Sequence, residues 1–504
     1  MVTLMDRCSI HRSKATTWIV GAVLMAAAFQ ADALPPLRVT VLIFASLTVF
    51  ALYAVRVVEL SVMTRLFIVL FSIPFSATLG YLINPEFVWT LGGNREALCL
   101  NHELINQMLL TAVVGLCGLM AGIEFITGRF KTGLRTASPD GDLDRRPTLQ
   151  APVFFVLLLT ALYFSWLHSP AKTIFEAAYD TLASGSHRDV RAGVNGAYLI
   201  SYLIIIFLSV DLELELSVPL RRLKAIGLYG VLGYIIVVLQ FLRGDRESTG
   251  LIAALSMLYV TRPAEASRQS TDGIRAIRQR KVQRLLVPIA AFIVAFLALG
   301  TLRGMLREPP LDPHRQHWAV QYLTKNTWTA VSLNNLGLAT EYHYGTVEYL
   351  HGKTYLDYLL SLPPRAFVLK FGIERPLDGP ANPSEWYRCL MTMGGMHPVI
   401  VPFKNFGIWG VSPVMFLWGS LIGYCELNNE RGRFSGRLLY GCLATSSMQW
   451  FWFGDFNLIR TLMMFGGLLV LHRVLTLRLP LRQTQSDRQL TMDIPQREIF
   501  ACQS

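Results

Sequence analysis

Charged residues are scarce in this chain of 504 residues. Only 16% are Asp, Glu, Lys or Arg, whereas 52% are hydrophobic and the mean hydropathy is +0.40. Soluble domains carry about 25% charged residues. So little charge and so many apolar residues exclude a disordered chain, a coiled coil and an ordinary water-soluble enzyme. The composition indicates an integral membrane protein.

Cysteine is also sparse, and none of the seven cysteines forms a CxxC pair, so neither a zinc site nor a disulfide framework is indicated. His343 and His351 lie near Glu341, but they lack HExxH or any comparable metal-ligand spacing. The external loops contain no DxD-type cluster. We therefore expect no metal and no cofactor.

Apolar windows recur along the chain, with a length and composition that predict about twelve transmembrane helices. They cover residues 16–34, 37–55, 64–83, 104–126, 151–168, 194–212, 225–242, 248–261, 285–302, 406–425, 437–453 and 460–475. The predicted fold is an all-α polytopic membrane protein. Its parts are nine helices with short loops in 1–302, a large loop in 303–403, three helices in 404–476 and a polar tail in 477–504.

The distribution of the 46 Lys and Arg residues predicts the orientation. With both chain ends on one side, that side holds 28 of the 46 basic residues, and short loops on the other side hold 8. By the positive-inside rule, the side whose short loops are richer in Lys and Arg is the cytoplasm. The rule therefore places both termini in the cytoplasm and the 303–403 loop outside. The basic run at 262–284 is interpreted as a topology anchor beside anionic lipid and not as a nucleic-acid site.

One short external turn carries two arginines where the rule disfavours them. Arg243 and Arg246 flank Asp245 at the membrane surface, just before a predicted helix. Guanidinium groups can hold phosphate oxygens in forked pairs, and a helix N-terminus also favours an anion. The alternative is that both arginines pair with Asp245 and Glu247 in a solvated turn.

Other external residues have the chemistry of a glycan or phosphate site. Arg303 follows an apolar run and is expected at the lipid interface, and Pro363–Pro364 ends a helical segment just before Arg365. The aromatic and amphipathic character of 303–403 predicts helices lying over the membrane. Three further residues are expected to contact sugars: Arg188, Lys404 and Asn405. His397 is expected to be either a base or a structural residue.

Three fragments resemble the Wzy-type O-antigen or oligosaccharide repeat-unit polymerases of bacterial inner membranes. They are FLRGDRESTGLIAAL, GKTYLDYLLSLPPRAF and GGMHPVIVPFKNFGIWGVSPVMFLWGSLIG. The topology agrees over nearly the full chain. Lys404 departs from the family pattern, in which an acidic residue is expected at that position.

The resemblance implies a GT-C-like glycosyltransferase that joins undecaprenyl-pyrophosphate-linked repeat units at the periplasmic face. It would use lipid-linked donor and acceptor glycans, no nucleic acid, and a Wzz-type chain-length regulator as an expected partner. Arg243, Arg246, Arg303 and Arg365 would then stabilise the leaving pyrophosphate. The general base would be one of three residues: His397, Asp245 and Glu341.

Two alternatives stay open at this point. An O-antigen ligase-like enzyme shares the donor, the external arginines and the large loop but uses a different acceptor. A flippase or secondary transporter for the lipid-linked unit would also suit twelve spans. Transporters, however, usually show internal repeats and charges near the bilayer midplane, and this sequence shows neither.

Overall fold

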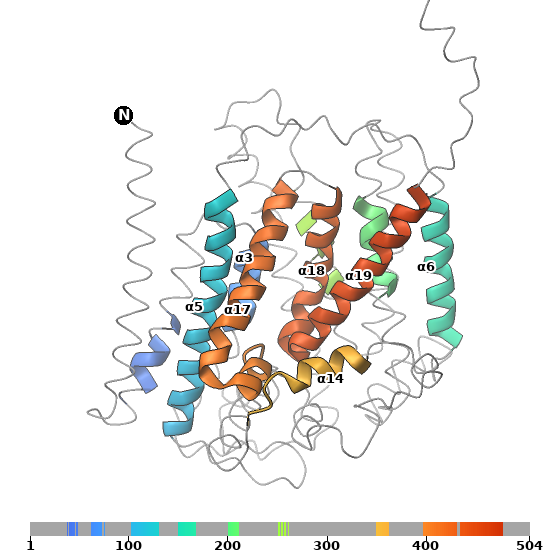
Figure 1. Ribbon diagram of the computed structural model, residues 1–504. Helices are drawn as coiled ribbons and strands as arrows, with labels where there is room; N and C mark the ends of the chain where they lie inside the picture. Colours follow the sequence, from blue (N-terminus) through green and yellow to red (C-terminus); the bar gives the residue numbers. More distant parts are fainter. Residues whose placement is uncertain are drawn as a thin grey trace, which may run out of the picture.

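The computed structural model describes residues 38, 40–45, 47–48, 62–72, 75, 102–130, 150–167, 200–210, 250–251, 254–255, 257–258, 261, 349–361, 397–430 and 434–476. Every regular element within these residues is a helix (Figure 1), which confirms the all-α fold class. The principal helices are α3 (Val62–Ser72), α5 (His102–Phe130), α6 (Gln150–Leu167), α14 (Lys353–Ser361), α17 (Ile400–Glu430), α18 (Phe434–Phe453) and α19 (Asp455–Thr476). The count of twelve spans and the domain boundaries stay predictions.

Three helices in the described part are long and apolar enough to cross a membrane: Asn106–Gly128, Ile400–Glu430 and Leu458–Leu475. They coincide with the windows expected at 104–126, 406–425 and 460–475. α18 and α6 also begin and end within a few residues of their expected windows. The apolar pattern therefore located these helices, because a lipid-facing helix must be apolar over most of its length.

Large apolar side chains cover the outward surfaces of these helices. On α17, Trp409 is 78% exposed, Leu417 66% and Tyr424 52%. Trp409 and Tyr424 lie near opposite ends of the helix, where indole and phenol rings suit the two water interfaces of a bilayer. A water-soluble protein would bury such a surface, whereas lipid tolerates it. The exposed side chains thus support a membrane environment.

α5 and α17 lie side by side (Figure 1) and run in parallel, with glycines at their contact. A Cβ on Gly118 would meet the carbonyl oxygen of Ser412, and one on Gly122 would meet that of Phe416. Gly419 of α17 approaches the Leu119 carbonyl oxygen of α5 in the same way. Lipid supplies little hydrophobic force between helices, so close backbone packing at small residues holds such pairs together.

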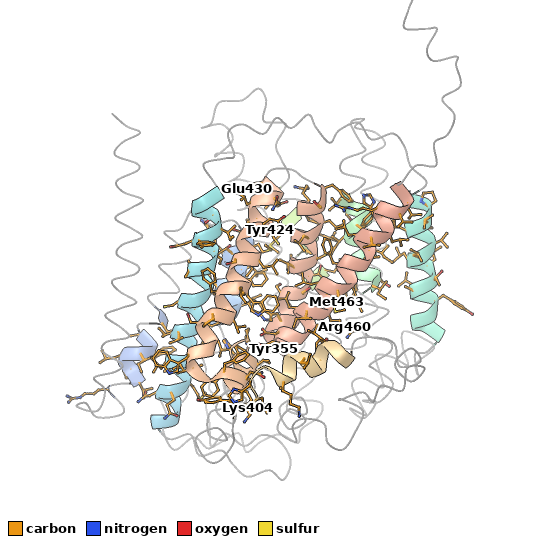
Figure 2. The ribbon with its side chains drawn as sticks, in the orientation of Figure 1. Tyr355, Lys404, Tyr424, Glu430, Arg460 and Met463 are labelled. Carbon is orange, nitrogen blue, oxygen red and sulfur yellow. The ribbon has the colours of Figure 1, made fainter. Side chains whose placement is uncertain are left out.

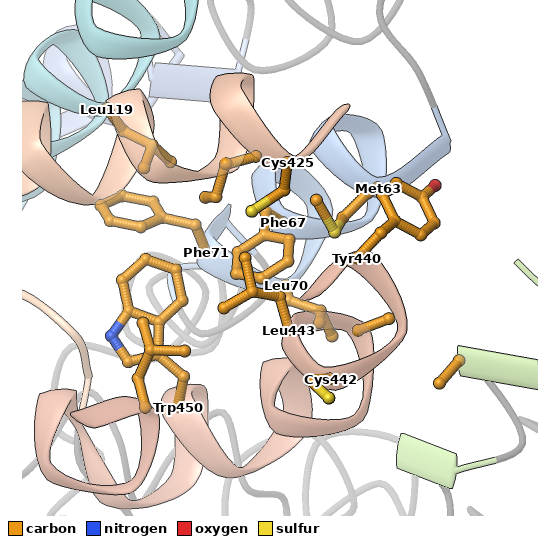
Figure 3. Close-up of a cluster of buried hydrophobic side chains, with 14 of the residues drawn as sticks. Met63, Phe67, Leu70, Phe71, Leu119, Cys425, Tyr440, Cys442, Leu443 and Trp450 are labelled. Atoms are coloured by element: carbon orange, nitrogen blue, oxygen red, sulfur yellow. The ribbon is translucent and has the colours of Figure 1, made fainter. Parts of the chain in front are cut away.

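α3 fills the space between α17 and α18 with aromatic side chains. The rings of Phe67 and Trp450 lie 5.3 Å apart. Figure 3 shows Phe67 and Phe71 of α3 among Cys425 of α17 and Leu443 of α18. Each of these side chains is at most 1% exposed. This cluster forms the centre of the described core.

Two buried charged side chains satisfy helix ends. Glu426 of α17 accepts a hydrogen bond from the backbone N–H of Thr64 at 2.8 Å, in the first turn of α3, where N–H groups lack helical partners. Arg437 of α18 donates to the carbonyl oxygens of Leu258 at 3.1 Å and Thr261 at 3.4 Å. The charges therefore act as caps and connect α17 and α18 to segments distant in sequence.

We expect Gly118→Ala to destabilise the protein. An alanine normally stabilises a helix by about 0.5–1 kcal/mol relative to glycine. At Gly118 the new methyl group meets the backbone of α17, and overpacking costs about 1–3 kcal/mol. Thermal unfolding of the purified protein in detergent measures the change. Gly466→Ala on α19 is the matched control, because nothing lies within 4 Å of its added Cβ. A midpoint for Gly118→Ala at or above that of Gly466→Ala would contradict the close packing.

Candidate active site at one end of the helix bundle

α17 is broken near its start at Gly407, where φ is 68° and ψ is −170°. Only glycine adopts this backbone conformation readily. The residues before the break form a short first segment, and those after it form the long helix. The break deprives the Lys404 and Asn405 carbonyls of their usual helical partners. Leu350 and His351 replace those partners, since their N–H groups donate to the two carbonyls at 3.3 Å and 2.9 Å.

α14 continues directly from these bonds and lies across the end of the bundle (Figure 1). The Asn405 Nδ2 group donates to Thr354 Oγ1 at 2.5 Å and to the Val401 carbonyl at 2.8 Å. The ring of Tyr355 stacks on Phe406, with centroids 6.3 Å apart and planes 11° from parallel. The sequence Asn405-Phe406-Gly407 therefore holds α14 in place through an amide, a ring and a backbone break.

Asp455 is a fully buried acidic residue at this end of the bundle. The turn between α18 and α19 is made by Gly454, whose φ is 70°, and Asp455 begins the next helix with 0% of its surface exposed. Its Oδ2 accepts a hydrogen bond from the Tyr355 hydroxyl at 2.6 Å, and its Oδ1 accepts one from Trp450 Nε1 at 2.8 Å. The Asp455 carboxylate, at the start of α19, thus connects α14 through Tyr355 and α18 through Trp450.

Burial raises the pKa of Asp455 to about 6, and the hydrogen bonds from Tyr355 and Trp450 lower it in part. The Trp418 indole lowers it as well, although its Nε1 makes no hydrogen bond of regular geometry. The same burial, with the charge of Asp455, raises the pKa of the Tyr355 hydroxyl well above its ordinary value. The Asp455 carboxyl can therefore gain or lose a proton near neutral pH while Tyr355 stays protonated.

Two basic side chains lie at the same end. Figure 2 shows Lys404, Arg460 and Tyr355 toward one end of the bundle and Tyr424 and Glu430 toward the other. Lys404 is 1% exposed. Arg460, on α19, lies close enough to Tyr358 of α14 for its charge to lower the phenol pKa, which burial raises to about 12. Positive charge and hydroxyl groups thus accompany the carboxylate.

His397 occupies a fully enclosed position beside α3. Its Nε2 lies 2.9 Å from the Phe71 carbonyl oxygen, and its Nδ1 accepts from the Val399 N–H at 3.4 Å. The rings of Phe71 and Phe75 stand edge-on to it at 4.6 Å and 4.8 Å. Burial lowers the pKa of His397 to about 3, and the Phe71 bond opposes this weakly. With both ring nitrogens engaged, these contacts favour the structural interpretation of His397.

Of the residues expected from the sequence, Lys404 and Asn405 lie in the first segment of α17, which bonds to the segment that carries α14. His397 lies just before α17. The remaining expected site residues lie outside the described part of the chain: Arg188, Arg243, Asp245, Arg246, Arg303, Glu341 and Arg365. No three His, Cys, Asp or Glu side chains gather to hold a metal ion within the described residues. No protein-family profile, curated protein or solved structure matches this chain.

Asp455 and Tyr355 are not among the site residues expected from the sequence. One signal was available, since Asp455 is the acidic residue in the short turn between two apolar windows. Nothing in the sequence connects that turn with a tyrosine 100 positions earlier. Only the docking of α14 brings the two side chains together.

We expect acidification to destabilise the wild-type protein more than a His397→Gln variant. An unfolded histidine takes up a proton as pH falls below 6.5, whereas the buried His397 ring stays neutral to about pH 3. The contribution of His397 to the free energy of unfolding should therefore fall by about 1.4 kcal/mol per pH unit between those limits. Thermal unfolding in detergent at pH 7.5 and pH 5 tests this. Equal losses in both proteins would show that His397 does titrate in the folded state.

Proposed function

We propose that this protein polymerises undecaprenyl-pyrophosphate-linked oligosaccharide repeat units into O-antigen or a related surface polysaccharide. The supporting observation is that α14 bonds to Asp455 through Tyr355 and to Asn405 through Thr354, at the end of an apolar helix bundle where Lys404 also lies. A lipid-linked glycan keeps its tail in the bilayer and its pyrophosphate at the surface. Its reaction site must therefore lie at the end of the helices.

The proposal includes a GT-C-like architecture of about twelve spans in the bacterial inner membrane, with both termini in the cytoplasm. Arg243, Arg246, Arg303 and Arg365 would stabilise the pyrophosphate as the sugar leaves it. Arg188, Lys404 and Asn405 would contact the sugars. A Wzz-type regulator would set the chain length. Since pyrophosphate is a good leaving group, the chemistry needs positive charge and a proton acceptor more than it needs a metal.

The position of the helix break favours an enzyme over a transporter. Transporters bind their substrates near the bilayer midplane, at helices interrupted there. In α17 the break at Gly407 lies seven residues after Ile400, and Asp455 precedes its spanning segment. Both features therefore belong to the end of the bundle. An O-antigen ligase would share this geometry, so the acceptor must be identified by experiment.

A gel of surface polysaccharide from a strain lacking the gene, beside its parent, tests the function. We expect the ladder of bands from long polysaccharide chains to disappear. A band from the lipid core with one repeat unit should remain, because flipping and ligation of single units continue. Loss of every repeat would instead indicate a ligase or flippase. An unchanged ladder would contradict a role in this polysaccharide.

We expect Arg243→Ala and Arg246→Ala each to abolish polymer while the protein remains inserted and abundant. The physical reason is loss of charge-assisted bonds to the leaving pyrophosphate, worth about 1.5–3 kcal/mol each. The same gel, read beside an immunoblot of membranes, checks this. Arg460→Lys is the control, because it keeps a positive charge beside Tyr358. Wild-type chain lengths in both alanine variants at equal protein levels would disprove the phosphate contact.

A further inference from the structure

Asp455 is a carboxylate buried without a cation. Among the described residues its two oxygens are bound by a tyrosine hydroxyl and an indole N–H, and no Lys, Arg or His pairs with it. Burying a carboxylate is costly unless it is paired or protonated. If the group only fastened α14 to the bundle, a neutral amide or hydroxyl would do so at lower cost. A buried carboxylate at this position therefore points to a function that uses its proton.

Tyr355 places a partly exposed side chain next to this buried group. Asp455 is fully enclosed, whereas Tyr355 is partly exposed and belongs to the helix that lies across the bundle. A proton can pass from a hydroxyl bound at Tyr355 Oη to Asp455 Oδ2 along the existing 2.6 Å hydrogen bond. Stacking on Phe406 and the Thr354–Asn405 bond hold the phenol in that orientation.

We propose that Tyr355 and Asp455 together accept the proton of the sugar hydroxyl that attacks the lipid-linked donor. This inference rests on the proposed polymerase function and assigns its proton acceptor. Tyr355 would be the residue that touches the acceptor sugar, and Asp455 would act through it. The pair takes the place of His397, whose two ring nitrogens are already engaged by the backbone.

The step balances in atoms and charge. The acceptor oxygen forms a bond to the donor sugar's anomeric carbon as the bond from that carbon to the phosphate oxygen breaks. The bonding electron pair leaves with the lipid pyrophosphate. The acceptor hydroxyl proton passes to Tyr355 Oη while the proton of Tyr355 passes to the Asp455 carboxylate. Tyr355 ends unchanged, and Asp455 ends neutral until it returns its proton to water.

The pair predicts how the rate depends on pH. Asp455 must be ionised to accept the proton, so the rate should fall as pH drops through about 6. Tyr355 from α14 is the titratable side chain in contact with it, while α17 and α18 contribute Trp418 and Trp450. The other ionisable side chains described at this end form no ion pair or hydrogen bond with Asp455: Lys353, Tyr358, His397, Lys404 and Arg460.

The test uses the full-length protein in liposomes with lipid-linked repeat units, and follows elongation at saturating substrate from pH 5 to pH 8. The wild type should lose activity below about pH 6. Asp455→Asn should lower the rate by about 100-fold or more and remove this decline at low pH. Asp455→Glu keeps a carboxylate at this position. It should therefore retain part of the rate and still lose activity at low pH.

Tyr355→Phe removes one hydroxyl and should lose rate to a similar degree, which keeps the test decisive if Asp455→Asn does not fold. Tyr358→Phe, the same change one turn along α14, should keep the decline near pH 6. Trp450→Phe removes a hydrogen bond that lowers the pKa of Asp455, so its decline should move to higher pH.

The outcomes separate this inference from the function on which it rests. A wild-type protein that never elongates the glycan would overturn both. If the wild type elongates, but Tyr355→Phe and Asp455→Asn keep its rate and its decline at low pH, only the proton-accepting pair is wrong. A lowered unfolding temperature with an unchanged pH profile would also reject the pair, because it would show that the contact merely fastens α14.

Discussion

Backbone groups without partners are the main constraint on a helix bundle in an apolar medium, because no water is present to bind them. α17 meets this constraint at its break. Gly407 interrupts the helix, and the carbonyls of Lys404 and Asn405 then bind the N–H groups of Leu350 and His351. The repair brings a second segment of chain to the end of the bundle. The docking of α14 follows from that exchange of partners.

The same rule explains the polar residues deeper in the bundle. Glu426 and Arg437 bind the exposed ends of neighbouring helices, so their charges satisfy backbone groups that would otherwise stay unpaired. Between such points, α5 and α17 approach until glycine meets backbone. Such close contacts suit a site that must hold a carboxylate, a phenol and an amide in fixed positions.

Asp455 differs from these structural charges. Glu426 and Arg437 each bind main-chain groups at helix ends, whereas Asp455 binds two side chains, one of them on α14. Its raised pKa reflects burial that these two bonds only partly offset. A group with that balance is poised for proton transfer near neutral pH. In the proposed function, it would lie where a glycan held by its lipid at the membrane surface meets the protein.

The sequence by itself determined the all-α class, the membrane environment and the position of α5, α17 and α19, because apolar length and helical period are local properties of the chain. It also marked Asn405 as a candidate sugar contact, whereas the backbone break at Gly407 came only from the structure. It did not reveal Tyr355 and Asp455 as partners, since contacts between residues 100 positions apart depend on how helices pack. Tertiary structure alone decided that pairing, and it likewise enclosed His397 between two phenylalanine rings, where neither ring nitrogen is free.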